Sequence, residues 1–353
     1  MAEAWVHGGT DALGIPAHDF STNRNACGPC PQAVQALQDA HCAQYPDPSY
    51  TALREQLAQF HGVSAQRIVV AGSASEFIHR ITMHAVRQGA ACVTLPEHHY
   101  GDYAQAAQVW GLLVADRARR AAGPGLHWAC APSSPLGQED MVCTLWAQTS
   151  VDAGWRVLDC AYAPLRLEEA SQAFPLEHIW QMWTPNKALG MTGVRAAYAI
   201  APLHTSAQEL LALRQLAPSW VVGAHGVAML QAWTTAVVQQ WLQHSLQQLQ
   251  TWKAQQLQMC ERLGWQLIPG HQANYMVARW PEELQTQMSA MLNDLRAQGI
   301  KLRDCASFGL PGCVRMGVLP QASQQALESA WKALELTGAY TPDQPAARMA
   351  YER

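Results

Sequence analysis

Lysine is rare in this chain, and one of its few lysines stands in a setting that suggests chemistry. The 353 residues contain four: Lys187, Lys253, Lys301 and Lys332. Lys253 and Lys332 fall in amphipathic helical patterns and Lys301 opens an apolar strand pattern, so surface ammonium groups on buried stems explain these three. Lys187 instead follows an apolar run that ends at Trp183, in the stretch WTPNKALGMTGVRAAYAI. It is therefore the candidate nucleophile.

Three more segments place polar or aromatic side chains where strands are expected to end. VLDCAYAP is an apolar run that ends in Asp159, with Tyr162 three residues later. VAGSASEFI, residues 70–78, is a Gly/Ser/Ala turn between a strand and a helix, and its exposed N–H groups suit a phosphate. Tyr100 follows a third apolar run and could stack on a planar ring. Each segment taken alone is also explained by a cap, a turn or a core side chain.

Together these features indicate one cofactor, pyridoxal 5'-phosphate. This cofactor needs a lysine for covalent attachment, a carboxylate at its ring nitrogen, a phosphate cradle and a donor to its phenolic oxygen. Lys187 and Asp159 would supply the first two groups, and the turn at 70–78 would supply the cradle. The carboxylate keeps the ring nitrogen protonated, which makes the ring an electron sink.

The spacing of apolar runs predicts the elements that position these residues. From about residue 67 to 202 short apolar strands alternate with amphipathic helices, which is typical of an α/β fold with a mainly parallel sheet. Ligands of such sheets bind at the carboxyl ends of the strands. Residues 203–262 predict helix, and 265–340 predict a smaller α+β region with one strand over 300–305. We expect an N-terminal arm at 1–30 that packs with the small domain, a large cofactor-binding domain at 31–240, a small C-terminal domain at 241–340 and a polar tail at 341–353.

The composition argues against some other classes of function. The net charge is −4 and the pI about 6.4, which gives no electrostatic reason to expect nucleic acid. No apolar run reaches the ~18 residues of a membrane span. The N-terminus lacks the pattern of a signal peptide, so we expect a cytoplasmic protein with reduced thiols.

One motif suggests a metal or redox site. Cys27 and Cys30 form a lone CxxC in the segment NACGPCPQ. A zinc site needs a second pair of ligands, and none is suitably spaced. A Gly/Pro turn explains the motif better, and we expect no bound metal.

The order of these residues resembles fold-type I pyridoxal-phosphate enzymes of the class I/II aminotransferase superfamily, from about residue 7 to 336. QYPDPSYTALREQLAQFHGV is similar to two branches, histidinol-phosphate aminotransferase and L-threonine-O-3-phosphate decarboxylase. HGG followed by DFSTNRNACGP, and LRDCASFGLPGCVRMGV, are similar to the decarboxylase branch. The resemblance implies aminotransferase fold type I, with a mainly parallel seven-stranded sheet between helices, a smaller α+β domain, and a homodimer with shared active sites.

The resemblance also implies roles for individual residues. Lys187 carries the cofactor and later handles the Cα proton, Asp159 pairs with the ring nitrogen, and Tyr162 donates to the phenolic oxygen. The other implied cofactor contacts are Ala74, Ser75, Tyr100, Ser134, Asn186, Arg195 and, from the neighbouring subunit, Tyr45. The implied substrate contacts are Arg315 for the α-carboxylate, with Arg303, His7, Ser21 and Asn23 as further candidates. The sequence departs from the family at several positions. Ser134 stands where an Asn is usual, Asn186 where a Ser or Thr contacts phosphate, Ala26 where a Pro is usual, and the phosphate turn lacks the common GNG.

On this resemblance the expected function is decarboxylation of L-threonine O-3-phosphate to (R)-1-aminopropan-2-yl phosphate in cobalamin biosynthesis. The alternative is an aminotransferase acting on histidinol phosphate or a related amino acid. The placement of the substrate carboxylate relative to the ring separates the two reactions. A third hypothesis, a non-catalytic aminotransferase-like regulator, is disfavoured because the sequence shows no helix-turn-helix segment and no basic face.

Overall fold

The computed structural model describes residues 8–115, 117, 124–142, 145–146, 154–170 and 174–336. The chain divides into two compact units. The large unit comprises Arg24–Gln250 and Gly270–Asn274, and the small unit comprises Met1–Asn23, Thr251–Pro269 and Tyr275–Arg353. Within the described ranges, no helix combines the length and the apolar character that crossing a membrane would require.

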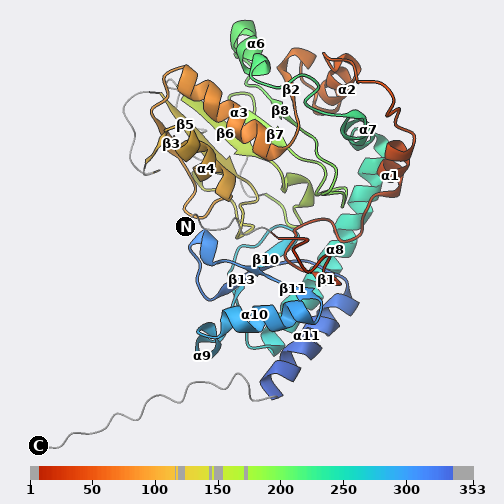
Figure 1. Cartoon of the computed structure of the whole chain (residues 1–353), viewed down its shortest axis with the longest axis vertical. Coiled ribbons are helices and arrows are strands. Elements are labelled where there is room, and N and C mark those ends of the chain that lie inside the picture. Colours follow the sequence, from red (N-terminus) through yellow and green to blue (C-terminus); the bar gives the residue numbers. More distant parts are fainter. Residues whose placement is uncertain are drawn as a thin grey trace, which may run out of the picture. The chain divides into compact units, whose positions relative to one another are not determined.

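A seven-stranded sheet forms the centre of the large unit (Figure 1). Its strand order is β2 (Ile68–Ala71), β8 (Ala197–Ile200), β7 (Trp180–Trp183), β6 (Gly154–Asp159), β5 (Gly125–Cys130), β3 (Cys92–Thr94) and β4 (Leu113–Ala115). Neighbouring strands are parallel except where β8 pairs with β2 and with β7. The predicted α/β fold with a mainly parallel seven-stranded sheet is confirmed.

Helices cover this sheet, and most of its strands are apolar because both faces are buried, whereas β4 at the edge is exposed. The helices of the large unit include α1 (Pro31–Gln38), α2 (Thr51–His61), α3 (Ala74–Arg87), α4 (Gly101–Val109), α6 (Ala207–Gln215), α7 (Ala224–Trp233) and the first part of α8 (Ala236–Arg262). Successive side chains of a strand point to opposite faces. On β6, Val157 therefore joins one core cluster with Phe77 of α3, while Leu158 joins another with Ile179. The next residue, Asp159, is the first carboxylate of the strand.

The helical region expected over 203–262 is interrupted. α6 ends at Gln215 and α7 begins at Ala224, and residues 216–223 between them are not helical. Pro218 lies in this gap, where its ring and missing N–H disfavour helix. Gly223 is the residue that precedes the first turn of α7.

Arginines cover the free edge of the sheet at β2. Arg54 Nε and Arg214 Nη2 both donate to the carbonyl oxygen of Ile68, each at 3.3 Å. Arg80 Nη2 donates to the carbonyl oxygen of Val70 at 2.9 Å. An edge strand leaves a row of unpaired main-chain groups, and these guanidinium groups satisfy part of that row.

The small unit contains two sheets and a cluster of tryptophans. The four-stranded antiparallel sheet has the order β12 (Arg303–Asp304), β13 (Cys313–Gly317), β10 (Tyr275–Arg279) and β9 (Gln266–Leu267), and β1 (His18–Asp19) pairs in parallel with β11 (Ile300–Lys301). Its helices include α9 (Glu282–Gln285), α10 (Met288–Ala297) and α11 (Gln321–Leu336). The rings of Trp265, Trp280 and Trp331 pack together, with centroids 4.7 to 5.4 Å apart.

The single strand expected over 300–305 is wrong. Ile300–Lys301 pair with β1, whereas Arg303–Asp304 pair with β13. The chain changes partner at Leu302, so the segment contributes two short strands to two different sheets. Alternation of side chains within a short apolar run cannot reveal such a change of partner.

The turn that carries Lys187 packs tightly against the segment that contains the CxxC motif. The Asn25 N–H donates to the carbonyl of Lys187, and the Cys30 N–H donates to the carbonyl of Leu189, both at 2.9 Å. Gly190 adopts a φ of +70°, and a Cβ placed there would lie 2.8 Å from Gly28 Cα. The close contact of the two segments therefore requires glycine at position 190.

We expect Gly190→Ala to lower the free energy of unfolding by about 2 kcal/mol or more, because a side chain there meets main-chain atoms in a left-handed conformation. Gly193→Ala is the matched control. No atom lies within 4 Å of the point that a Cβ would occupy there, and its φ is not left-handed, so its effect should stay within about 0.5 kcal/mol. Urea unfolding followed by tryptophan fluorescence measures both. Equal stability of the two variants would contradict the account of this turn.

Candidate active site

Asp159 and Lys187 lie at the carboxyl ends of neighbouring parallel strands. Asp159 is the last residue of β6 and is only 5% exposed, and Lys187 follows the end of β7 by four residues. The Asp159 Oδ1 accepts from the Ala161 N–H at 2.8 Å, and its Oδ2 accepts from the Tyr103 hydroxyl at 2.5 Å. Lys187 Nζ donates to Thr184 Oγ1 at 3.4 Å. The sheet thus brings together the two residues on which the cofactor prediction depends.

The Asp159 carboxyl has an environment that suits a cationic partner. Burial raises its pKa above the usual value of 3.8. The positive charge of Lys187 and hydrogen bonds from Tyr103 and Ala161 lower the pKa, and they offset burial only in part. A protonated ring nitrogen is a cation of the kind that would stabilise the ionised carboxylate here. The residues present therefore fit this part of the predicted cofactor.

Two tyrosines flank this pair. Tyr162 follows β6, is largely buried, and has its ring centroid 5.2 Å from Lys187 Nζ. Tyr103 lies on α4 and was not among the residues expected to act, although it stands only three positions after Tyr100. Tyr100 is the residue before the first turn of α4, and the centroids of the two rings lie 5.8 Å apart. The second tyrosine so close to the first was the signal available for finding it.

The turn expected to hold phosphate forms the start of α3. Ser73 caps this helix, and its Oγ accepts from the Glu76 N–H at 3.1 Å. Glu76 also accepts from the Gly72 N–H, and its charge is paired with the buried Arg80 at 2.7 Å. The main-chain N–H groups of Ala74 and Ser75 lie in the first turn, where a helix has no internal partners for them. They suit an anion at this helix terminus.

Tyr100 contacts the first turn of α3, and Ser134 lies in the loop that follows β5. The hydroxyls of Tyr100 and Ser75 are 3.5 Å apart, which connects the residue before α4 with the first turn of α3. Burial raises the pKa of the Tyr100 phenol, so it stays protonated in neutral solution. Ser134 is buried in the loop after β5.

Asn186, where the sequence departs from the family pattern, forms its side-chain contact within its own turn. Its Nδ2 donates to the carbonyl oxygen of Val194 at 3.3 Å. Its Oδ1 is buried and accepts no hydrogen bond from any residue that the structure describes. Arg195, which follows Val194, has an exposed side chain. The roles of Asn186 and Arg195 toward phosphate stay predictions.

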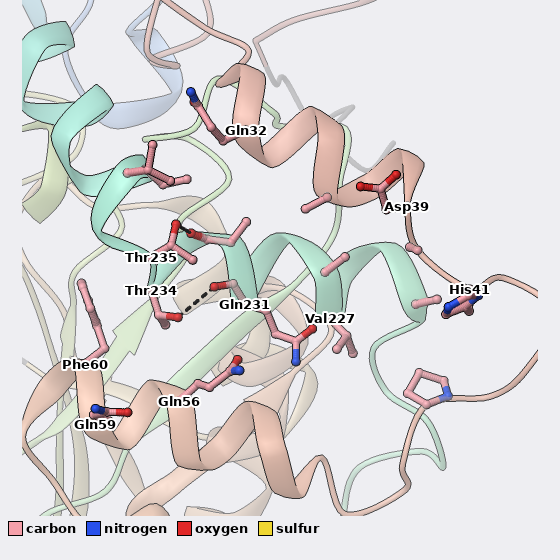
Figure 2. A pocket seen from close by; sticks show the side chains of 18 of the residues that line it. Gln32, Asp39, His41, Gln56, Gln59, Phe60, Val227, Gln231, Thr234 and Thr235 are labelled. Atoms are coloured by element: carbon pink, nitrogen blue, oxygen red, sulfur yellow. Dashed lines mark hydrogen bonds between the residues drawn. The ribbon is translucent and has the colours of Figure 1, made fainter.

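Tyr45 is exposed on another side of the large unit. Its side chain is 76% exposed and stacks on Trp220, with ring centroids 4.3 Å apart. It borders an open cavity of about 1000 Å3 that neither Lys187 nor Asp159 lines. Figure 2 shows α7 lying between α1 and α2 in the wall of this cavity, which carries many uncharged polar side chains, including Gln32, Gln56, Gln59, Gln231, Thr234 and Thr235.

The small unit gathers four of the five predicted substrate contacts. Arg303 and Arg315 face each other in the pairing of β12 with β13, and their guanidinium carbons lie 4.7 and 5.6 Å from the ring centroid of Phe308. Arg315 Nη2 donates to the carbonyl oxygen of Ser21 at 3.0 Å, and Asn23 is also buried. His7 lies outside the described residues.

Two buried guanidinium groups side by side favour an anionic ligand. Burial and the like charge of Arg315 lower the pKa of Arg303. Arg303 donates to the Ser307 hydroxyl and to a main-chain carbonyl, and no carboxylate within the described ranges forms an ion pair with it. Guanidinium groups bind carboxylate and phosphate with two parallel hydrogen bonds. Among all the residues that the structure describes, no cluster of three or more His, Cys, Asp or Glu is suited to hold a metal ion.

Comparison with known proteins defines the family. The family model described as aminotransferase class I and II matches residues 16–119 and 128–334. A histidinol-phosphate aminotransferase of Jannaschia sp. is 26% identical over 338 residues, which cover 88% of this chain and 89% of the relative. This protein therefore belongs to the class I and II aminotransferase family.

Solved structures agree on the fold. A histidinol-phosphate aminotransferase from Sinorhizobium meliloti, solved in complex with pyridoxal-5'-phosphate, matches with a TM-score of 0.74 at 20% identity, over 90% of this chain and 92% of that one. An L-threonine-O-3-phosphate decarboxylase from Porphyromonas gingivalis also matches with a TM-score of 0.74, at 17% identity, over 90% of this chain and 99% of that one. At these identities the likeness concerns the fold and does not choose between the two reactions.

The raised pKa of Asp159 predicts a pH dependence of stability. The folded protein without cofactor binds this proton more tightly than the unfolded chain, so stability falls as the pH rises from 3.8 through the raised pKa. We expect Asp159→Asn to gain stability over wild type across that range, by about 1.4 kcal/mol for each unit by which the pKa is raised. Urea unfolding of cofactor-free protein at about pH 5 and about pH 8 measures the difference.

Asp47→Asn is the control with the opposite sign. N–H groups of Thr51 and Ser49 lower the pKa of this exposed carboxyl, so wild type should gain stability over that variant as the pH rises from the lowered pKa to 3.8. Between about pH 5 and about pH 8 the stability difference between wild type and Asp47→Asn should therefore not change. A stability difference between wild type and Asp159→Asn that does not change with pH would contradict the account of the buried carboxyl.

Proposed function

We propose that this protein is a pyridoxal-phosphate-dependent aminotransferase whose substrate is a small phosphorylated amine of the histidinol-phosphate type. The observation that carries the proposal is the buried Asp159 beside Lys187 at the ends of adjacent parallel strands, in a chain of the aminotransferase family. Similarity to a histidinol-phosphate aminotransferase over 88% of the chain supports transamination over decarboxylation.

The cofactor is pyridoxal 5'-phosphate, as the sequence predicts from its residues. Membership of the family and the cofactor complex of the Sinorhizobium relative support this assignment. Lys187 would hold the cofactor covalently, Asp159 would face its ring nitrogen, and the N–H groups of Ala74 and Ser75 would hold its phosphate. When bound, the cofactor supplies an electron-accepting ring that stabilises negative charge on the substrate.

Asp159, Tyr162 and Lys187 would hold or transfer protons during the reaction. Asp159 would keep the ring nitrogen protonated, because a buried carboxylate favours a bound cation. The phenol of Tyr162 would donate to the phenolic oxygen. Lys187 Nζ would take the proton from the substrate Cα. The buried surroundings of Asp159 exclude water, which strengthens these electrostatic contacts.

A pair of arginines is the candidate for binding the charged part of the substrate. Arg303 and Arg315 present two buried guanidinium groups on neighbouring strands. Because each can form two hydrogen bonds to a phosphate or a carboxylate, the pair suits a substrate with one or two such groups. Ser21, Asn23 and His7 stay candidates for further contacts.

Decarboxylation of threonine phosphate is the second candidate, and one specific observation favours it. The segments similar to the decarboxylase branch meet within the small unit. The Gly9 N–H donates to Ser21 Oγ at 2.8 Å, and Arg315 donates to the carbonyl oxygen of the same residue. Cobalamin biosynthesis belongs to this candidate only.

Product analysis tests the proposed reaction. We expect cofactor-loaded protein to form glutamate from 2-oxoglutarate when histidinol phosphate is the amino donor, with no product when either compound is left out. Incubation with threonine phosphate alone should release no CO2. Lys187→Ala, which lacks the residue that moves the proton, should be inactive in both assays. Release of CO2 from threonine phosphate without a keto acid would overturn the proposal and support the second candidate.

We also propose a homodimer in which Tyr45 of each subunit completes the site of its neighbour. The support is the exposed aromatic side chain of Tyr45 beside an open cavity whose wall carries mostly uncharged side chains. A second copy on this side would bury that surface, as stable interfaces do.

Mixing of inactive variants tests the shared site. Lys187→Ala and Tyr45→Ala should each have little activity alone. A hybrid dimer has one site with Lys187 from one subunit and Tyr45 from the other, so subunit exchange should restore activity. Two Lys187→Ala preparations mixed together are the control. Absence of recovery, with hybrid dimers confirmed by mass, would show that Tyr45 does not act across subunits.

A further inference from the structure

Tyr103 is enclosed directly behind the Asp159 carboxylate. Its side chain on α4 is 1% exposed, and its hydroxyl donates to Asp159 Oδ2 at 2.5 Å. Its ring stacks on Trp128 of β5, with centroids 4.4 Å apart and planes 11° from parallel. The stacking fixes the ring, and the fixed ring determines where the hydroxyl points.

We propose that Tyr103 is a positioning residue that keeps Asp159 ionised and correctly oriented for the ring nitrogen of the cofactor, an inference that rests on the proposed function. Each carboxylate oxygen is held by one donor, Oδ2 by Tyr103 from α4 and Oδ1 by the Ala161 N–H from the loop after β6. Donors on two different elements fix the plane of the carboxylate. Preorganisation of this kind spares the site from reorganising during the reaction.

The charges around Asp159 explain why the Tyr103 hydroxyl would help to keep the carboxylate ionised when the cofactor is attached. Burial and the negative charge of Asp102 raise the pKa of Asp159, while the positive charge of Lys187 lowers it. Other titratable groups nearby include the buried thiols of Cys130 and Cys160 and the phenol of Tyr100, whose pKa values are raised, so they stay neutral. Covalent attachment of the cofactor consumes the free ammonium group of Lys187. The hydrogen bond from Tyr103 does not depend on that ammonium group.

Tyr103 can act as a donor throughout the working pH range. Burial and the charge of Asp159 hold the pKa of its phenol well above the usual value of 10. A phenylalanine would preserve the stacking on Trp128 and remove only the hydroxyl. Packing alone therefore does not require tyrosine at this position.

Tyr103→Phe tests the proposal by cofactor binding rather than by activity. We expect the dissociation constant of pyridoxal phosphate to rise about tenfold, the size of a hydrogen bond to a charged group. The midpoint of the pH titration of the bound cofactor's absorbance should shift upward by roughly one unit. Tyr198→Phe is the matched control, since its buried hydroxyl contacts His61 and Trp233, and both measurements should stay at wild-type values.

A double-mutant cycle separates positioning from packing. If Tyr103 acts through Asp159, Tyr103→Phe should have little further effect on cofactor affinity in an Asp159→Asn background. An undiminished effect in that background would overturn the proposal, as would unchanged affinity and titration in Tyr103→Phe alone. If Tyr103→Phe leaves affinity and titration unchanged while wild type binds the cofactor, the proposal for Tyr103 fails and the proposed function is unaffected. Failure of wild type to bind the cofactor would overturn both.

Discussion

The burial of one carboxylate, Asp159, is the constraint on which the rest of the site depends. Asp159 lies at the end of a strand in a sheet that helices cover. Burial of an ionised group costs free energy unless hydrogen-bond donors or an opposite charge surround it. The fold supplies them from different elements: a hydroxyl from α4, an N–H from the loop after β6, and the ammonium group of Lys187 after β7. These partners offset the cost only in part. A further cation beside Asp159 would stabilise its ionised form. This is the physical reason for placing the protonated ring nitrogen of the cofactor at Asp159.

The position of Lys187 is determined by main-chain contacts. Its turn is held by hydrogen bonds from Asn25 and Cys30, and the approach of the two segments depends on Gly190 and Gly28. Asn186 belongs to the same arrangement, because its amide joins the residue before the lysine to Val194. The departure from the family's hydroxyl therefore has a structural explanation within this chain. The conformation of the turn is set by contacts that do not involve the lysine side chain.

The parts that could be predicted from sequence depend on local pattern, and the parts that could not depend on distant partners. Short apolar runs between helices predicted the sheet, and a rare lysine and a strand-terminal Asp predicted the centre of the site. Tyr103 was missed because its role depends on contact with Asp159, 56 residues away. The change of sheet at Leu302 was missed for the same reason, because pairing with β1 involves the other end of the sequence.

The identity of the lysine that carries the cofactor tests the central claim most directly. Borohydride reduction of protein loaded with pyridoxal phosphate fixes the cofactor to the lysine that holds it, and mass spectrometry of peptides locates that residue. We expect the added mass on the peptide that contains Lys187, and no added mass in Lys187→Ala. Modification of Lys253, Lys301 or Lys332 in place of Lys187, or no specific modification at all, would contradict it.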